Sequence, residues 1–387
     1  MRRALLALLA GGALTLSFPG SGIWVLAPVG VGALALATRG TSIRTGAGLG
    51  LLAGLACFLP TLSWTGTYVG ALPWVALAIL QALYVAFAGA VSSALQRGVS
   101  VAGADRVRPF VVALAWVGSE ALRARTPYGG FPWARIAFTQ ADSPLAHIAA
   151  LAGAPGVTFA VALAGGVLAS AVAPRATLSA PTDLESPGAF STRVGVAGST
   201  RSRVVAMPRW RRLGVAVVLV VSPLAVPLYS EGRPADVMAV QGNVPHPGLD
   251  FNAERRAVLD NHVSATTRAA AQVRAGSLTQ PDLVVWPENS SDIDPVRNTD
   301  AALQVNLALE AIRAPLLIGT LRIGDDRSVR NVAELYEAGR GLVAEYTKRH
   351  PVPFAEYIPN RAFFRLFSDK VDLLTRDFSA GSAPGLF

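Results

Sequence analysis

The chain has 387 residues, of which 52% are hydrophobic and only 15% are charged, and its formal net charge is +9. Its mean hydropathy of +0.42 is positive, whereas soluble domains carry about 25% charged residues. This composition excludes an ordinary soluble domain and a disordered chain, and it indicates a membrane protein or a membrane segment joined to a soluble one.

Charge divides the chain into two parts. Residues 1–228 hold 17 arginines, no lysine and 5 acidic residues, a net charge of +12, whereas residues 229–387 hold 17 basic and 20 acidic residues, a net charge of −3. We therefore predict a multi-span membrane domain over 1–228 and a polar domain over 229–387. The basic excess does not indicate nucleic-acid binding, because it lies in the connectors of the apolar half.

Apolar runs in the first part predict seven membrane spans, several of them near the ~20 residues that a bilayer needs. Residues 174–211, rich in Ser, Thr, Ala, Gly and Pro, are predicted to form a cytoplasmic connector. Fourteen of the 17 arginines fall on the side of the N-terminus, which predicts a cytoplasmic N-terminus and an extracytoplasmic polar domain. The predicted spans are residues 1–18, 22–38, 46–64, 71–95, 109–122, 146–173 and 212–228.

The predicted outside loop 123–145 differs from the other outside loops. It contains the other three arginines and the aromatic segment from Tyr128 to Trp133. One interpretation is an interfacial anchor whose arginines bind lipid phosphates. The other is a re-entrant loop that lines a lipid-binding site.

Short apolar runs alternate with helical stretches from residue 235 onward, which predicts βαβ units and a buried sheet. Side chains just past the carboxyl ends of such strands are site candidates. Glu288 and Lys348 occupy such positions. The predicted strands are residues 236–241, 282–286, 315–319, 331–336 and 341–346, and the predicted helices are 252–274 and 301–312.

Lys348 is one of two lysines in a chain with 32 arginines, which suggests a need for a compact ammonium. Glu288 follows Trp286 by two residues and is either a site carboxylate or a solvated loop residue. Glu356 lies eight residues after Lys348, and two intervening prolines favour a fixed loop that returns it to the lysine. The alternative for Glu356 is a surface pair with Arg349.

Three motifs, Val285-Trp286-Pro287-Glu288, Tyr346-Thr347-Lys348-Arg349 and the segment 352–357, resemble the nitrilase superfamily. With several spans ahead of them, and with the segments 130–133 and 241–245, the closer resemblance is to the apolipoprotein N-acyltransferase family. The resemblance implies a polytopic α-helical membrane domain followed by an incomplete α/β/β/α nitrilase-like sandwich.

The resemblance implies an enzyme of the plasma membrane that moves an acyl chain from a phospholipid to the α-amino group of a diacylglyceryl-cysteine in lipoproteins. The reaction is ping-pong through a thioester and needs no cofactor or metal. It further implies that Glu288 is the general base, that Lys348 stabilises the oxyanion and that Glu356 supports the lysine. Some relatives are fused to a polyprenol-phosphate glycosyltransferase, which makes such an enzyme a possible partner. The residues at substrate-contacting family positions are Asn331, Phe251 and Trp133.

The only cysteine, Cys57, lies in the third predicted span, where apolar surroundings leave a thiol inert. It allows no intramolecular disulfide and no Cys-rich metal site. In the family the nucleophilic cysteine follows the lysine and the second glutamate on a later strand. We therefore expect a piece of a longer enzyme rather than a degenerate homologue, and we expect the 387 residues alone to form no thioester.

Two other functions remain open from the sequence. One is a catalytically inactive homologue that binds lipid or acts as a scaffold, and the other is a membrane-bound nitrilase-type amidohydrolase with water as acceptor. The seven spans argue against the hydrolase, since a soluble substrate needs only one anchor. A transporter is disfavoured, because Glu120 is the one acidic residue that we find within a predicted span, at its end.

Overall fold

The computed structural model describes residues 1–97, 107–173, 207–228, 232–244 and 251–387. The chain forms two compact units, Met1–Tyr229 and Ser230–Phe387. Residues 174–206 of the predicted connector lie outside the described residues. Each unit is described by itself below.

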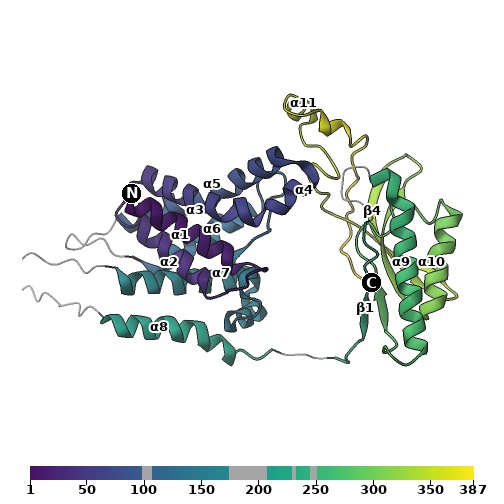
Figure 1. The fold of residues 1–387 in the computed structure, drawn as a ribbon, viewed down its shortest axis with the longest axis horizontal. Coiled ribbons are helices and arrows are strands. Elements are labelled where there is room, and N and C mark those ends of the chain that lie inside the picture. The colour runs from purple at the N-terminus through teal and green to yellow at the C-terminus, as the bar shows by residue number, and fades with distance from the viewer. Residues whose placement is uncertain (98–106, 174–206, 229–231, 245–250) are drawn as a thin grey trace, which may run out of the picture. The chain divides into compact units, whose positions relative to one another are not determined.

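The first unit is helical, and each of the seven predicted spans contains a helix (Figure 1). Among the described residues, three apolar helices are long enough to cross a membrane: Ile43–Thr61, Ala71–Gln96 and Pro144–Val172. The chain is therefore a membrane protein, and the number of seven spans remains a prediction. The helices are α1 (Arg2–Ser17), α2 (Leu26–Thr38), α3 (Ile43–Thr61), the one-turn α4 (Gly66–Val69), α5 (Ala71–Arg97), α6 (Pro109–Arg123), α7 (Ala149–Val172) and α8 (Arg209–Val221).

Glycines at four-residue intervals let α3 approach α5 closely. A Cβ atom at Gly50 would clash with the carbonyl oxygen of Val85, and one at Gly54 would lie 2.7 Å from the Cα atom of Ala82. Small residues at this spacing are the usual means by which apolar helices pack in a bilayer, where lipid tails remove the hydrophobic drive between helices.

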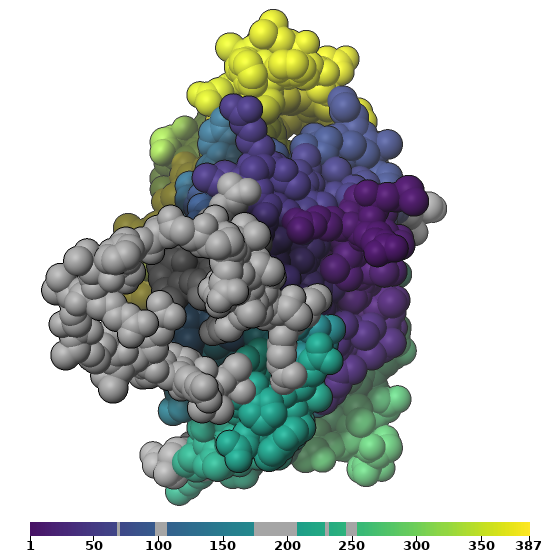
Figure 2. Space-filling model, turned by 90° about the vertical axis from the view of Figure 1, so that its left-hand side faces the viewer, coloured from purple at the N-terminus to yellow at the C-terminus, as the bar shows by residue number. Residues whose placement is uncertain are grey.

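Other helix faces of this unit carry exposed apolar side chains, as lipid contact requires. On α8, Trp210, Val217 and Val218 are each more than 60% exposed. The space-filling view shows α1 in purple and α8 in teal on this surface (Figure 2). Such exposure of large apolar side chains is typical of a lipid-facing surface.

The second unit is built on a five-stranded mixed sheet of order β1-β2-β3-β4-β5. The first three strands are parallel, and β4 and β5 form antiparallel pairs with the preceding strand. The predicted third strand continues to Ile323, because it pairs with β4 along its whole length. The strands are β1 (Val237–Ala239), β2 (Leu283–Val285), β3 (Leu316–Ile323), β4 (Val329–Glu337) and β5 (Gly341–Thr347).

Two helices, α9 (Phe251–Arg274) and α10 (Thr299–Ile312), pack on one face of this sheet. Asn298 caps α10, since its side chain accepts hydrogen bonds from the backbone amides of Asp300 and Ala301. The described residues thus give a sheet with helices on one face, and the full α/β/β/α sandwich remains a prediction. The buried core includes Leu259, Val263, Leu309, Leu316 and Ile318.

A half-buried arginine joins three carboxylates at the end of β3. Arg322 lies 3.2 Å from Glu334, 3.2 Å from Glu345 and 3.3 Å from Asp294. Burial raises the pKa of Glu334 although the Tyr336 hydroxyl and Arg322 act to lower it. The cluster gives every charged group a partner, which a buried charge requires.

The glycine contact predicts a position-specific effect on the first unit. In Gly50→Ala the new methyl group must displace backbone of α5, so we expect a loss of about 1–3 kcal/mol, as for overpacked cores. In Gly48→Ala, where a Cβ atom meets nothing within 4 Å, we expect no loss and a gain of up to about 1 kcal/mol from helix propensity. Thermal unfolding of both variants in the same detergent measures the difference. Equal midpoints would contradict the close packing.

Candidate active site

Glu288 lies three residues past the end of β2, at the carboxyl edge of the parallel strands. Gly319 of β3 packs against it, because a Cβ atom there would lie 2.5 Å from the carbonyl oxygen of Pro287 and 2.6 Å from the Cα atom of Glu288. The Glu288 side chain is 54% exposed. The glycine therefore lets the backbone of Glu288 approach the sheet while its carboxylate stays open to a substrate.

Lys348 follows β5 directly, and the sheet register fixes its place. Its backbone amide donates to the carbonyl oxygen of Asn331 on β4 at 2.8 Å. Glu334 of β4 pairs with Ile318 of β3, which packs against the helices, so both side chains point to the helix-covered face. Asn331 lies three residues before Glu334 on the same strand. Since side chains alternate along a strand, Asn331 points to the face opposite α9 and α10. The site therefore lies on the sheet face that these helices leave open.

Glu356 is returned to Lys348 by a tight loop. Its backbone amide donates to the carbonyl oxygen of Val352 at 2.8 Å, and its Oε2 accepts from the Val352 amide at 2.6 Å. The side chain is buried. The loop thus holds this carboxylate through its own backbone, and no ion pair with Arg349 is found among the described residues.

The four polar side chains meet in one hydrogen-bonded group. Lys348 Nζ donates to Glu288 Oε1 at 2.7 Å and to Glu356 Oε1 at 3.1 Å. Asn331 Nδ2 donates to the same two oxygens, at 2.5 Å and 2.6 Å. The two carboxylates are therefore joined by one ammonium and one amide, and the group carries a net charge of −1.

The two carboxylates keep Lys348 protonated. Partial burial acts to lower the pKa of Lys348, but the hydrogen bonds and charges of Glu288 and Glu356 outweigh it and raise the pKa above its ordinary value. Lys348 is therefore a cation at neutral pH. A fixed cation beside a half-exposed carboxylate can stabilise a developing oxyanion while the carboxylate accepts a proton.

Asp292 is a further acidic residue of this region that the sequence did not reveal as special. Burial raises its pKa to about 6, with Arg255 acting to lower it and Glu288 to raise it further. Its only sequence signal is an acid four residues after Glu288. The shift makes Asp292 a carboxylate whose own charge changes near neutral pH.

The other predicted site residues take no part in the hydrogen bonds of this group. Trp133 belongs to the first unit, in the loop after α6, where it is 50% exposed and stacks on Trp64 with ring centroids 4.9 Å apart. Phe251 is the first residue of α9, and its side chain falls outside what the structure describes. Cys57 is buried in α3.

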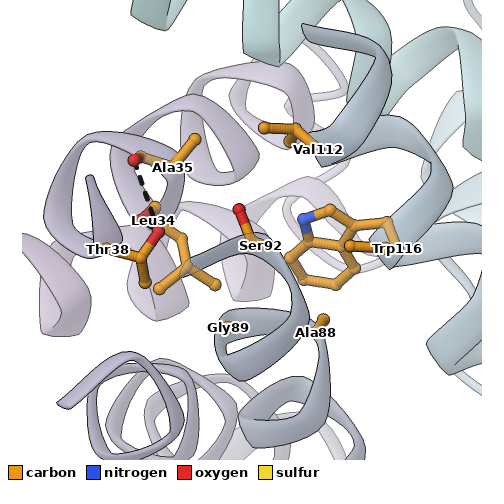
Figure 3. Close-up of a pocket in the computed structure, with 9 residues that line it drawn as sticks. Leu34, Ala35, Thr38, Ala88, Gly89, Ser92, Val112 and Trp116 are labelled. Atoms are coloured by element: carbon orange, nitrogen blue, oxygen red, sulfur yellow. Dashed lines mark hydrogen bonds between the residues drawn. The ribbon is translucent and has the colours of Figure 1, made fainter. Parts of the chain in front are cut away.

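A small pocket among α2, α5 and α6 of the first unit offers no comparable chemistry (Figure 3). Its lining has the hydroxyl groups of Thr38 and Ser92 and the indole of Trp116, with no acid, amine, imidazole or thiol among these described residues. Thr38 already donates to the carbonyl oxygen of Leu34 at 2.9 Å. The polar group around Lys348 is therefore the stronger candidate for an active site.

Known proteins align with this chain along nearly its whole length. The model of the apolipoprotein N-acyltransferase N-terminal domain matches residues 10–167. Similar proteins are the apolipoprotein N-acyltransferases of Mycolicibacterium smegmatis (38% identical, 94% of this chain), Photobacterium profundum (25%, 98%) and Geobacter metallireducens (29%, 98%). The chain spans 59%, 68% and 69% of these relatives. The matches confirm the resemblance to the apolipoprotein N-acyltransferase family.

The charge arrangement predicts how Lys348 titrates. In Glu356→Gln one of its two carboxylates is removed, so the pKa of Lys348 should fall and its neutral amine should appear at lower pH. Each unit of pKa shift is about a tenfold change in the protonation equilibrium. Amine acylation followed by mass spectrometry over pH 8–11 measures the midpoint, with Lys370, the only other lysine, as the internal reference.

The matched control is Glu337→Gln, which removes a carboxylate of β4 that pairs with Arg340. The midpoint of Lys348 should stay unchanged in this variant. The same midpoint in wild type and Glu356→Gln would contradict the role of Glu356.

Proposed function

We propose that this relative of apolipoprotein N-acyltransferases acts in acyl transfer from a phospholipid to the α-amino group of a diacylglyceryl-cysteine. The observation that carries the proposal is the convergence of Glu288, Lys348, Glu356 and Asn331 within hydrogen-bonding distance. These residues lie in motifs that resemble those of the family, and the model of the apolipoprotein N-acyltransferase N-terminal domain matches residues 10–167.

In the amine-transfer step the acceptor nitrogen attacks the carbonyl carbon of a thioester. Glu288 takes the proton that the nitrogen loses, and the thiolate leaves when the tetrahedral intermediate collapses. Lys348 stabilises the oxygen that becomes negative in that intermediate. Glu356 holds Lys348 and Asn331 holds Glu288, and Asn331 also donates to Glu356.

The thioester itself needs a thiol near this group. The only cysteine of the sequence is Cys57, which is buried in α3 of the first unit. We therefore propose that these 387 residues supply the base, the cation and their supports, and that alone they form no thioester from phospholipid.

Exposed apolar side chains follow the site along the chain and favour a lipid substrate. Val352 and Phe354 are 44% and 49% exposed in the loop that carries Glu356. Beyond it, around α11 (Arg361–Phe364), Phe363 packs against Phe364 and Phe367 with ring centroids 5.2 Å apart, while Phe363 and Phe367 stay exposed. Contiguous apolar exposure of this kind marks a surface for an apolar ligand or a membrane.

For the membrane we propose the finer topology that the sequence predicts. Seven spans with a cytoplasmic N-terminus would put residues 229–387 on the extracytoplasmic side, as an α/β/β/α sandwich. The support is that seven apolar helices occupy the predicted spans and that most arginines of the first part lie in the connectors on the N-terminal side. A site there would meet the headgroups of the outer leaflet.

A second candidate is lipid binding without transfer, which the burial of the only cysteine favours, because apolar surroundings leave a thiol inert. A hydrolase with the same Glu and Lys would pass the acyl chain to water instead. The three functions differ in the product that they form, so one experiment can separate them.

In the test, a soluble thioester serves as the acyl donor. Purified protein in phospholipid nanodiscs receives a palmitoyl thioester of a small thiol and a diacylglyceryl-cysteine peptide. We expect the wild type to accelerate palmitoylation of the peptide amine by about tenfold or more, a modest share of what a positioned base and cation contribute. Glu288→Gln and Lys348→Met should each remove the acceleration.

Controls define what each outcome means. Glu337→Gln and Lys370→Met should retain the rate, and phospholipid as the sole donor should give no transfer. Free palmitate as the product would support the hydrolase. A rate equal to that without protein would leave only the binding function.

A further inference from the structure

Two charged side chains are buried at the end of α6, next to the loop that carries Trp133. Glu120 and Arg123 are 8% and 3% exposed, and Glu120 Oε1 lies 3.8 Å from Arg123 Nη2. Charges in such surroundings persist only when paired and hydrogen-bonded, and within a membrane protein they usually serve a function.

The guanidinium of Arg123 collects backbone carbonyl groups of the loop. It donates to the carbonyl oxygens of Phe131, Trp133 and Ala134, the contacts to Phe131 and Ala134 being 3.2 Å each. A further bond of 3.2 Å goes to Gln81 of α5. Carbonyls of three of the four residues 131–134 therefore turn toward one planar group.

The end of α6 holds the same loop at two further points. Glu120 Oε1 accepts from the backbone amide of Ile136 at 2.8 Å, and the amide of Phe131 donates to the carbonyl oxygen of Arg123 at 2.9 Å. Thr158 of α7 donates to Glu120 Oε2 at 2.8 Å, which fixes that carboxylate. The loop from 131 to 136 is thus tied to α6 along its length.

This attachment leaves the indole of Trp133 facing outward in a defined place. Trp133 stacks on Trp64 with an interplanar angle of 25° and touches Phe131 with ring centroids 5.1 Å apart. Half of the Trp133 side chain is exposed although its backbone is bound to Arg123. A flat aromatic surface held this way can meet an acyl chain without first being ordered.

We propose that Arg123, held by Glu120, is a positioning residue that fixes Trp133 for contact with the lipid substrate. The part of the proposal that concerns the substrate rests on the proposed function, whereas the placement of Trp133 does not. Arginine suits the task because its planar group donates in several fixed directions, whereas a lysine ammonium is a compact point charge.

The test reads the place of Trp133 directly. The seven tryptophans are replaced by 5-fluorotryptophan, and the ¹⁹F signals of Trp133 and Trp64 are assigned with Trp133→Phe and Trp64→Phe. In Arg123→Gln we expect both signals to move by more than their line width, with the signals of Trp210 and Trp286 unchanged. Arg125→Gln, which removes an exposed guanidinium that donates to the carbonyl oxygen of Ala121 on α6, should leave all signals in place.

A lysine variant covers the case in which Arg123→Gln fails to fold. Arg123→Lys keeps the charge but not the fork of donors, so the two signals should still move. Unmoved signals in either folded variant, or equal movement in Arg125→Gln, would overturn the positioning role.

A second measurement separates this role from the proposed function. Addition of a spin-labelled phosphatidylglycerol to the wild type should broaden the Trp133 signal more than in Arg123→Gln. A wild-type Trp133 signal that the spin-labelled lipid leaves sharp would overturn contact with the lipid substrate, while the placement by Arg123 would stand on the signal positions alone.

Discussion

The ammonium group of Lys348 needs acceptors, and the candidate site follows from where they come. Glu288 reaches it from the end of β2, Glu356 from the loop after β5, and Asn331 of β4 joins both carboxylates. A slip of β5 by one residue would turn Lys348 to the helix-covered face. The register of the antiparallel strands, itself fixed by the core that contains Ile318 and Leu316, is therefore a condition for this hydrogen-bonded group.

In the first unit, too, a cation needs hydrogen-bond acceptors, and there this requirement orders a loop. Arg123 is buried where water cannot serve it, so its donors must find protein acceptors, and backbone carbonyls of the loop supply them. In both units a single cation holds neighbouring segments through several hydrogen bonds. The cations differ in type, since Arg123 addresses several carbonyls through a planar fork while Lys348 addresses two carboxylates as a point charge.

Much of the second unit was predictable because its strands are short apolar runs whose ends carry polar residues. Lys348 was found through composition, as one of two lysines in the chain, and Glu288 through its place after a strand. The continuation of β3 to Ile323 was missed, because Arg322 interrupts the apolar run and its three carboxylate partners are visible only in the fold.

The attachment of the loop to Arg123 could not be read from the sequence, because backbone carbonyls leave no mark in residue identity. The sequence carried no sign of a role for Glu120 for the same reason, since Ile136 donates to it through its backbone amide. The seven spans stay open because helices of 13 to 16 residues cover only about 20–24 Å of a hydrocarbon core of about 30 Å.

The central claim is that the carbonyl end of a lipid acyl chain binds at Lys348 and Glu288. A phosphatidylglycerol with a photoreactive group beside its acyl carbonyl, incorporated in nanodiscs with the protein, tests it after illumination and peptide mapping. The account predicts attachment to the peptides that contain residues 286–291 and 346–356, and a loss of that attachment in Lys348→Met but not in Lys370→Met. Attachment that is absent from both peptides, or unaffected by Lys348→Met, would contradict it.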